Sequence, residues 1–239
     1  MAGDYGAPKR GIGLKGATMG REGSGRMLDG VAGIVLAAGE GRSFGGPKAL
    51  VRFGGRTLVE RAIRTLADGG CRPVVVVLGA AEAEVRRSSD LAGAVVAVNA
   101  AWSEGLGGSL RTGLTEARVA SARAAVVLLV DQPLVTPALI GRLIGAWRAG
   151  AVVAVAAYRR KGLTPVLLDQ STWDEVARSA VGDVGARAFI RARPELVTLV
   201  DCDDVGAPDD IDSPEDLRRL RRDRSASGRS GRPRNGRAR

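Results

Sequence analysis

Residues 36–48 form a glycine-rich segment with two positive charges, and they are the first part of the sequence that could do chemistry. The segment reads LAAGEGRSFGGPK and contains four glycines, namely Gly39, Gly41, Gly45 and Gly46. Glycines let backbone amides converge without Cβ clashes, so the segment can form a nest for phosphate oxygens. Arg42 and Lys48 stand six residues apart and can neutralise a polyphosphate. We therefore predict phosphate binding here, rather than a flexible strand-to-helix connection with solvated basic residues.

The same segment departs from two common phosphate-binding motifs. It is not a Walker A loop, because Gly46 is followed by Pro47 and Lys48 and no Gly-Lys-Ser/Thr ends it. It also fails the dinucleotide pattern G-x-G-x-x-G, because Phe44 stands where the third glycine should be. The prediction of a phosphate site therefore depends on the glycines and the two cations, not on a known motif.

Two aspartates could hold a metal ion beside bound phosphates. Asp131 directly follows the apolar run Leu128-Leu129-Val130, which places it at the carboxyl end of a buried strand. A hard carboxylate there suits Mg²⁺ shared with substrate phosphates, although a turn aspartate before Pro133 is the alternative. Asp212 stands just before Ser213-Pro214, where an acidic helix start favoured by the helix dipole is the alternative.

Two further loops could contact a ligand. Residues 99–109 read NAAWSEGLGGS, and the glycines at 105, 107 and 108 allow close approach of a flat ligand such as a base. Trp102 in this loop could stack on a ring, or it could fill the core, which is the commoner role of a tryptophan. Residues 182–187 read GDVGAR and form a polar turn with one cation, for which an ordinary loop is the alternative.

The sequence contains no histidine, which limits the chemistry it can perform. Ser-His-Asp and Cys-His nucleophilic schemes, histidine zinc sites and imidazole bases are all excluded. The chain has two cysteines, Cys71 and Cys202, and their wide separation supports neither a disulfide framework nor a CxxC metal site. Catalysis must therefore depend on carboxylates, lysine, arginine, backbone amides and a metal ion.

Apolar runs alternate with helical patterns through the body of the chain. The expected strands are residues 31–37, 73–78, 94–98, 124–130, 151–157, 164–168 and 196–200. The expected helices are residues 57–66, 81–87, 109–117, 137–149, 172–179, 184–193 and 214–220. Strands that are continuously apolar indicate burial on both faces. We therefore predict an α/β fold of three layers, a mainly parallel sheet covered by helices on both sides.

The net charge of +10 belongs to the two ends of the chain. Residues 1–26 carry a net +3, residues 221–239 carry +7, and residues 27–220 are neutral. Both ends are rich in Gly, Ser, Pro and Arg, so they cannot bury enough apolar surface to fold. We predict a disordered basic extension at 1–26, one folded domain at 27–220 and a disordered Arg-rich tail at 221–239. Binding of nucleic acid through these tails is an alternative function, but no specific nucleic-acid partner is expected.

No membrane segment is expected. Apolar runs such as Ala124–Val130 are far shorter than the ~20 residues of a membrane-spanning helix. The N-terminal residues are basic but have no apolar region typical of a secretory signal. We therefore expect a cytoplasmic protein.

The chemical segments together resemble a known family. LAAGEGRSFGGPK, NAAWSEGLGGSLRTGL, LLVDQP, GDVGAR and DIDSPEDL follow one another in that order. This set resembles the MobA-like nucleotidyltransferases, and most closely the molybdenum cofactor cytidylyltransferases, from about Val31 to Leu220. The first segment alone is shared by many nucleotidyltransferases, whereas the ordered set is far more specific. The resemblance implies a Rossmann-like fold and transfer of a nucleotidyl group from a nucleoside triphosphate.

The resemblance also implies roles for individual residues. Arg42 and Lys48 would hold the phosphates and, with Asp131, would be the catalytic residues. Asp131 and Asp212 would bind Mg²⁺. The implied nucleotide-binding residues are Leu36, Ala37, Ala38, Gly39, Gly41, Arg42, Lys48, Gly79, Asn99, Gly105, Gly107 and Ser109. The implied acceptor-binding residues are Gly182, Asp183 and Arg187.

The identity of both substrates is less firmly implied. The Leu-Ala-Ala-Gly opening is similar to the cytidylyltransferase form, which favours CTP over GTP as the nucleotide. The expected acceptor is molybdopterin, and a molybdoenzyme is a candidate partner. However, the family pattern has Gly-His-Pro or Gly-Asn-Pro before the late strand, whereas this chain has Gly162-Leu163-Thr164-Pro165. Because this segment is expected near the acceptor, the departure puts the identity of the acceptor in doubt.

The expected reaction is in-line attack by an acceptor phosphate oxygen on the α-phosphorus of CTP, with release of pyrophosphate. A phosphate monoester is already anionic at pH 7, so the lack of histidine is no obstacle. One alternative is a guanylyl- or sugar-phosphate nucleotidyltransferase of the same superfamily. A second is a module that binds nucleotide or molybdopterin without catalysis, although such a module needs no pair of metal-binding aspartates.

Overall fold

The computed structural model describes residues 30–91, 93–159 and 161–227. Its centre is a seven-stranded sheet with the strand order β5-β4-β1-β6-β8-β7-β9. The strands are β1 (Val31–Leu36), β4 (Val74–Leu78), β5 (Ala94–Val98), β6 (Ala124–Leu129), β7 (Val153–Tyr158), β8 (Lys161–Asp169) and β9 (Val197–Asp201). All neighbouring strands are parallel except that β8 runs antiparallel to β6 and β7. A separate hairpin pairs β2 (Arg52–Phe53) with β3 (Arg56–Thr57).

Burial on both faces explains why the strands are continuously apolar. Every residue of the inner strand β1, which lies between β4 and β6, is buried. Its side chains alternate between two hydrophobic cores, with Val31 and Val35 in one and Ile34 in the other. A polar side chain on such a strand would be buried, and its burial is costly unless it finds a hydrogen-bond partner.

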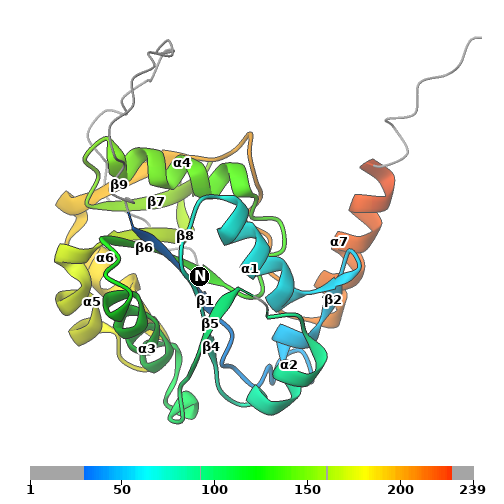
Figure 1. Ribbon diagram of the computed structural model, residues 1–239. Coiled ribbons are helices and arrows are strands. Elements are labelled where there is room, and N and C mark those ends of the chain that lie inside the picture. The colour runs from blue at the N-terminus through cyan, green and yellow to red at the C-terminus, as the bar shows by residue number, and fades with distance from the viewer. Residues whose placement is uncertain (1–29, 92, 160, 228–239) are drawn as a thin grey trace, which may run out of the picture.

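Helices cover both faces of the sheet, as Figure 1 shows. The helices are α1 (Leu58–Asp68), α2 (Glu82–Ser88), α3 (Leu106–Val119), α4 (Pro137–Arg148), α5 (Trp173–Ser179), α6 (Arg187–Ala192) and α7 (Pro214–Ser227). Helices α1, α2, α4 and α7 contribute side chains to one core, and α3, α5 and α6 contribute to the other. The predicted three-layer α/β fold is therefore confirmed. None of the helices within the described residues is long and apolar enough to cross a bilayer.

Local sequence signals begin several of these helices. Thr57 caps α1 through a capping box with Glu60, in which each side chain bonds the backbone N–H of the other residue. Thr136 caps α4 and is followed by Pro137 at the first helical position. These caps set the residue at which each helix begins.

The structure differs from the sequence-based expectation in three places. Only two residues separate β7 from β8, which is too short for a parallel crossover, so β8 is antiparallel. The β2–β3 hairpin was not expected. Helix α7 continues to Ser227, so the boundary placed at residue 220 is too early, and residues 221–227 are helical rather than a disordered tail. The predicted extension at 1–26 and the rest of the tail, 228–239, lie outside the described residues.

Candidate active site

One lysine joins two distant aspartates at the carboxyl edge of the sheet. The Nζ of Lys48 donates hydrogen bonds to Asp131 Oδ2 at 2.9 Å and to Asp212 Oδ1 at 2.6 Å. Asp131 lies two residues beyond the end of β6, and Asp212 lies two residues before the start of α7. The structure thus brings together three residues that the sequence analysis expected to meet.

The burial of these groups is uneven. The side chains of Lys48 and Asp131 are 15% and 18% exposed, whereas that of Asp212 is 68% exposed. Burial alone would lower the pKa of Lys48, but the two carboxylates outweigh it and raise the pKa above its ordinary value. Lys48 is therefore a fixed positive charge at any physiological pH.

The loop that carries Lys48 has a tight backbone turn at Gly41. The amides of Phe44, Gly45 and Gly46 all donate to the carbonyl oxygen of Gly41. Gly41 has a φ of +69°, and a Cβ there would lie 1.9 Å from the carbonyl oxygen of Gly46. Only glycine fits this position without rearrangement of the loop.

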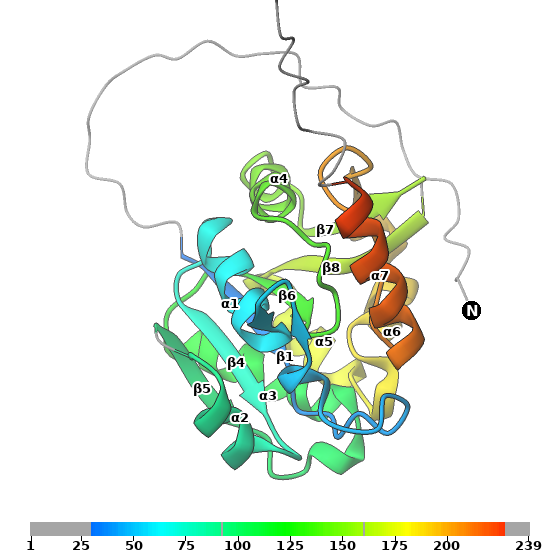
Figure 2. The same ribbon diagram turned by 90° about the vertical axis from the view of Figure 1, so that its right-hand side faces the viewer.

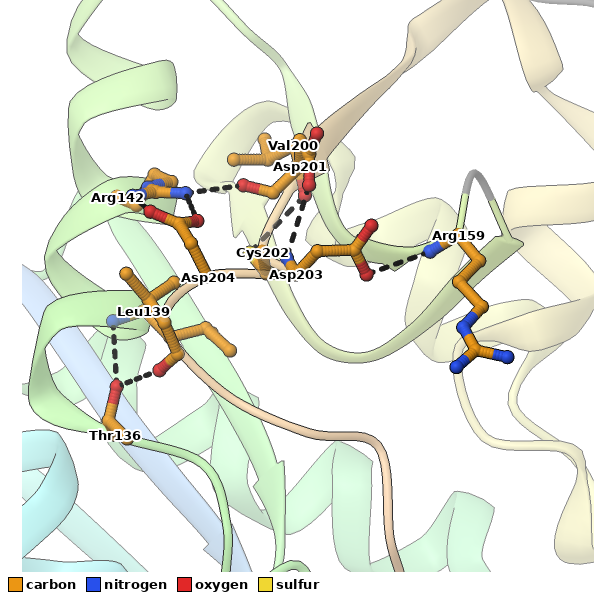
Figure 3. A network of polar contacts seen from close by, with 10 residues as sticks. Thr136, Leu139, Arg142, Arg159, Val200, Asp201, Cys202, Asp203 and Asp204 are labelled. Carbon is orange, nitrogen blue, oxygen red and sulfur yellow. Dashed lines mark hydrogen bonds and ion pairs between the residues drawn. The ribbon is translucent and has the colours of Figure 1, made fainter.

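Asp212 lies near the end of the long connection between β9 and α7, and hydrogen bonds hold this connection against the rest of the domain. Arg142 of α4 donates to Asp204 at 2.6 and 3.0 Å and to the carbonyl oxygen of Asp201 at 2.8 Å (Figure 3). In the same network Asp203 accepts a 2.9 Å hydrogen bond from the backbone N–H of Arg159. In Figure 2 the blue glycine-rich loop lies close to the orange start of α7, and the hydrogen bond from Lys48 to Asp212 joins the two segments.

Further hydrogen bonds hold the connection at the site itself. The N–H of Ile211 donates to the carbonyl oxygen of Asp131 at 2.9 Å, and the Ile211 side chain is fully buried. Ser213 and Asp216 then form reciprocal side-chain to backbone hydrogen bonds at the first turn of α7. Asp212 is therefore held between an apolar anchor and a helix cap.

The two aspartates fit a divalent metal ion shared with phosphate. Asp131 Oδ1 is buried and has no hydrogen-bond partner within the described residues, so it has free capacity as a ligand. No group of three or more His, Cys, Asp or Glu residues in the described part of the chain forms a metal cage of its own. Two carboxylates that leave the remaining positions to water and phosphate match the way Mg²⁺ binds in nucleotide enzymes.

Arg42 lies outside this group of residues. Its side chain is 82% exposed and forms an ion pair with Glu40 of the same loop. The two cations of the glycine-rich loop thus differ, because Lys48 is paired with two carboxylates whereas Arg42 belongs to an exposed surface pair worth little.

The expected nucleoside loop contains a buried polar pair. Asn99 Nδ2 donates to Ser109 Oγ at 3.1 Å, and Asn99 Oδ1 accepts from the N–H of Ala101 at 3.1 Å. Both side chains are buried, so in this structure they shape the loop. Gly79, at the end of β4, is equally constrained, since a Cβ there would lie 2.5 Å from the Cβ of Trp102.

The expected nucleoside and acceptor loops touch one another. A Cβ on Gly105 would lie 2.5 Å from the carbonyl carbon of Gly182, and one on Gly107 would lie 2.3 Å from the carbonyl oxygen of Ala180. Asp183 Oδ1 accepts a 3.3 Å hydrogen bond from the N–H of Leu106 at the start of α3. Arg187 is exposed as the first residue of α6.

The rest of the expected nucleotide-binding segment is buried at its first residues and exposed at Gly39. Leu36, Ala37 and Ala38 are buried, and the N–H of Ala37 donates to Val77 of β4 at 3.0 Å. Gly39 is exposed, with open space where a Cβ would stand.

Sequence reasoning missed two polar residues beside the aspartates. Gln132 is buried, and its Nε2 donates to Asp210 Oδ1 at 3.0 Å. Burial raises the pKa of Asp210 to about 6, the hydrogen bond from Gln132 opposes the rise, and the carboxylates of Asp131 and Asp212 add to it. The polar Gln132 between Asp131 and Pro133, and the acidic run Asp209-Asp210, were visible in the sequence, but only the fold shows that they meet.

Comparisons with known proteins identify the family of the chain. The family model described as the MobA-like NTP transferase domain matches residues 33–197. A protein named nicotine blue oxidoreductase from Paenarthrobacter nicotinovorans is 40% identical over 199 residues, which cover 80% of this chain and 96% of that protein. A protein named "Probable molybdenum cofactor guanylyltransferase" from Opitutus terrae is 39% identical over 124 residues, which cover 50% of this chain and 57% of that protein.

A solved structure is similar over most of the chain. The manganese complex of Rv0371C from Mycobacterium tuberculosis H37Rv has a TM-score of 0.65 and 29% identity, covering 81% of this chain and 98% of that one.

Proposed function

The chain belongs to the MobA-like NTP transferase family and is an enzyme of the nucleotidyltransferase type, and on this premise we propose that it transfers CMP from CTP to a phosphorylated acceptor. The acceptor we propose is molybdopterin, with pyrophosphate as the second product. Lys48, Asp131 and Arg42 are the proposed catalytic residues. A molybdoenzyme that takes up the product is the proposed partner.

One observation carries the proposal. The ammonium of Lys48 lies between the carboxylates of Asp131 and Asp212, next to a glycine-rich loop at the carboxyl edge of a parallel sheet. Ligands of open α/β sheets gather at this edge. A cation and two metal-binding carboxylates at such a place match the charge of a nucleoside triphosphate with its metal ion.

The proposed reaction is a single displacement at phosphorus. An acceptor phosphate oxygen forms a bond to the α-phosphorus of CTP as the bond to the β-phosphate oxygen breaks, and the electron pair leaves with pyrophosphate. Mg²⁺ held by Asp131 and Asp212 would supply charge neutralisation on the phosphates. A similar Mycobacterium tuberculosis protein has been solved as a manganese complex, which supports the use of a divalent metal ion by this chain.

The residues of the chain would align the reactants and neutralise charge. Lys48 would turn from the carboxylates towards the triphosphate, and Arg42 would leave Glu40 to bind the departing pyrophosphate. Gly39 and Gly41 would allow the phosphates to approach the loop backbone. No proton has to be removed from the attacking group, because a phosphate monoester is ionised at pH 7, which suits a chain without histidine.

The remaining contacts are proposed for the two substrates. Gly79, Asn99, Gly105, Gly107 and Ser109 would form the wall beside the nucleoside. The turn that contains Gly182, Asp183 and Arg187 would face the acceptor, and its contact with the nucleoside loop supports two substrates bound side by side. The guanylyltransferase name of the Opitutus terrae relative supports a molybdenum cofactor acceptor, but it favours GTP over CTP.

A panel of nucleotides tests this proposal. Each of CTP, GTP, ATP and UTP is supplied with Mg²⁺ and molybdopterin, and pyrophosphate release is measured. We expect release with CTP and at least ten-fold less with the others, together with the largest rise in Tm for Mg-CTP. Preference for GTP would overturn the nucleotide assignment, and no release with any nucleotide would overturn the transfer reaction.

An oxidoreductase is a second candidate function, supported by the 40% identity to nicotine blue oxidoreductase over nearly its whole length. A phosphate-binding loop at a sheet edge can also hold the diphosphate of a nicotinamide coenzyme. The discriminating experiment mixes the protein with NADH or NADPH and nicotine blue and follows the coenzyme at its absorbance maximum. Coenzyme oxidation without pyrophosphate release in the first assay would favour this second function.

A further inference from the structure

Gln132 connects the two sides of the candidate active site. It directly follows Asp131 and is only 7% exposed. Its Nε2 donates to Thr164 Oγ1 at 2.6 Å and to Asp210 Oδ1 at 3.0 Å. Thr164 belongs to the segment Gly162–Pro165 on β8, and Asp210 lies two residues before Asp212. A single side chain therefore contacts both the aspartate-bearing connection and the segment expected near the acceptor.

The orientation of this amide is fixed by its partners. An ionised carboxylate can only accept hydrogen bonds, so the NH₂ group of Gln132 and not its oxygen must face Asp210. As a result Gln132 Oε1 is buried and has no partner among the described residues. Buried amide oxygens are nearly always paired, so this arrangement is poor for stability alone. The side chain is therefore placed by its contacts to Thr164 and Asp210 and not by pairing of its own oxygen.

The buried side chain of Ile211 anchors the segment 210–212, and three hydrogen bonds hold this segment near the end of β6. They are the backbone hydrogen bond from Ile211 to Asp131, the Gln132–Asp210 hydrogen bond, and the bond from Lys48 to Asp212. In the proposed reaction Lys48 turns towards phosphate, which removes the last of these. Among the described residues, the bond from Gln132 to Asp210 is then the side-chain hydrogen bond that remains between the two carboxylate-bearing segments.

We propose that Gln132 is a positioning residue that holds the segment 210–212 so that Asp212 stands opposite Asp131, and that also sets Thr164 on the acceptor side. This inference rests on the proposed function, because it assumes that Asp131 and Asp212 share a divalent metal ion. Gln132 itself touches neither metal nor phosphate in this account, and it acts through Asp210 and Thr164.

Metal binding gives a readout that does not depend on catalysis. The experiment titrates Mn²⁺ into the full-length protein and measures free Mn²⁺ by electron paramagnetic resonance. The variants are Gln132→Leu, Asp131→Asn and Asp210→Asn. The matched control is Trp147→Phe, which removes a 2.7 Å side-chain hydrogen bond to Asp169 at the opposite edge of the sheet. The Tm of each variant is measured to separate loss of folding from loss of metal.

Each variant has a defined expected result. Gln132→Leu weakens Mn²⁺ binding ten- to a hundred-fold, as loss of a residue that orients metal ligands does elsewhere. Asp210→Asn keeps an oxygen that accepts from Gln132, so its Mn²⁺ affinity stays within about three-fold of wild type. Trp147→Phe lowers Tm and leaves Mn²⁺ binding unchanged.

The failures of the two proposals can be told apart. If the wild-type protein binds no Mn²⁺, or if Asp131→Asn binds it normally, the metal site of the proposed function is overturned and the role of Gln132 with it. If those two behave as expected but Gln132→Leu binds Mn²⁺ like wild type, only the role of Gln132 is overturned. Loss of Mn²⁺ binding in Asp210→Asn would also overturn it, since Asp210 would then be a direct ligand.

Kinetics give a second readout that a purely structural role would not produce. In Gln132→Leu the kcat of pyrophosphate release falls and the KM of the acceptor rises, while the KM of CTP stays within about two-fold of wild type. An equal effect on both KM values, or none on kcat, would contradict a positioning role.

Discussion

Replacement of Lys48 by alanine tests the geometry of the site most sharply. The ammonium is largely buried and bridges a buried and an exposed carboxylate. Removal of one partner from a fully buried ion pair costs about 3–5 kcal/mol, because the other charge is left unpaired. Since water screens Asp212, we expect a loss of about 2 kcal/mol, which corresponds to a fall in Tm of about 4–8 °C for a domain of this size.

The same variant should lose catalysis by more than its stability explains. If Lys48 turns to the triphosphate, kcat/KM for pyrophosphate release should fall roughly 10²–10³-fold at a temperature where the variant is folded. Arg86→Ala is the matched control, because it removes a cation from the exposed ion pair with Glu82 on α2. Such a pair contributes about 0.3–0.5 kcal/mol, so the control should change Tm by no more than about 2 °C and leave turnover unchanged.

Two measurements compare Lys48→Ala with the Arg86→Ala control. Differential scanning calorimetry gives Tm, and a coupled assay gives pyrophosphate release. If Lys48→Ala matched the Arg86→Ala control in both, the bridge between the two aspartates would contribute nothing and the site would lie elsewhere.

Three other predictions follow from the loop, the buried carboxylate and the thiols. Gly41→Ala should lower both Tm and the affinity for CTP, because its Cβ would lie 1.9 Å from a carbonyl oxygen of the same loop. Gly39→Ala places its Cβ in open space, so it should lower only the affinity for CTP, as measured by calorimetric titration. Burial raises the pKa of Asp210 from 3.8 to about 6, so the native protein loses stability as pH rises from about 4 to about 6. The free energy of unfolding of Asp210→Asn, measured with urea, should therefore equal that of wild type at pH 4 and exceed it by about 1–2 kcal/mol at pH 7, with allowance for solvent screening. Equal free energies of unfolding at pH 7 would contradict the raised pKa. Burial also raises the pKa of Cys71 to about 12 and of Cys202 to about 11, so neither thiol should react with a disulfide reagent at pH 8 until urea unfolds the chain.

The fold could be predicted largely because burial leaves a strong pattern. Strands such as Val74–Leu78 are apolar at every position, which only a sheet covered on both faces requires. The Thr136-Pro137 and Ser213-Pro214 pairs marked helix starts because capping is a local interaction. By contrast, the antiparallel direction of β8 follows from the short connection to β7, and the sequence around residue 160 carries no strong turn signal.

The end of α7 shows a different limit. Its arginine-rich second half has little apolar character and was expected to be disordered. The structure instead places Arg224 over the ring of Phe53 and bonds Arg221 to the carbonyl oxygen of Arg52, so the helix packs on the β2–β3 hairpin. Such long-range packing by charged side chains cannot be seen in a local pattern.

The candidate site was predictable only in part for the same reason. Lys48, Asp131 and Asp212 were recognised by their positions next to strand and helix ends, and the structure brings them together. Gln132 and Asp210 were missed, because only a contact across 78 residues of sequence places them together beside the aspartates. Asn99 and Ser109 stay predicted beside the nucleoside, and the structure adds that their side chains are hydrogen-bonded to each other, a contact that a local pattern does not show.

The decisive measurement is pyrophosphate release from CTP, Mg²⁺ and molybdopterin, compared between wild type and Asp131→Asn. We expect steady release by the wild-type protein and a rate roughly 10²–10³-fold lower for the variant, which keeps the size of the side chain but loses its charge. Equal rates for the two proteins would show that Asp131 takes no part in the reaction and would rule out the proposed site.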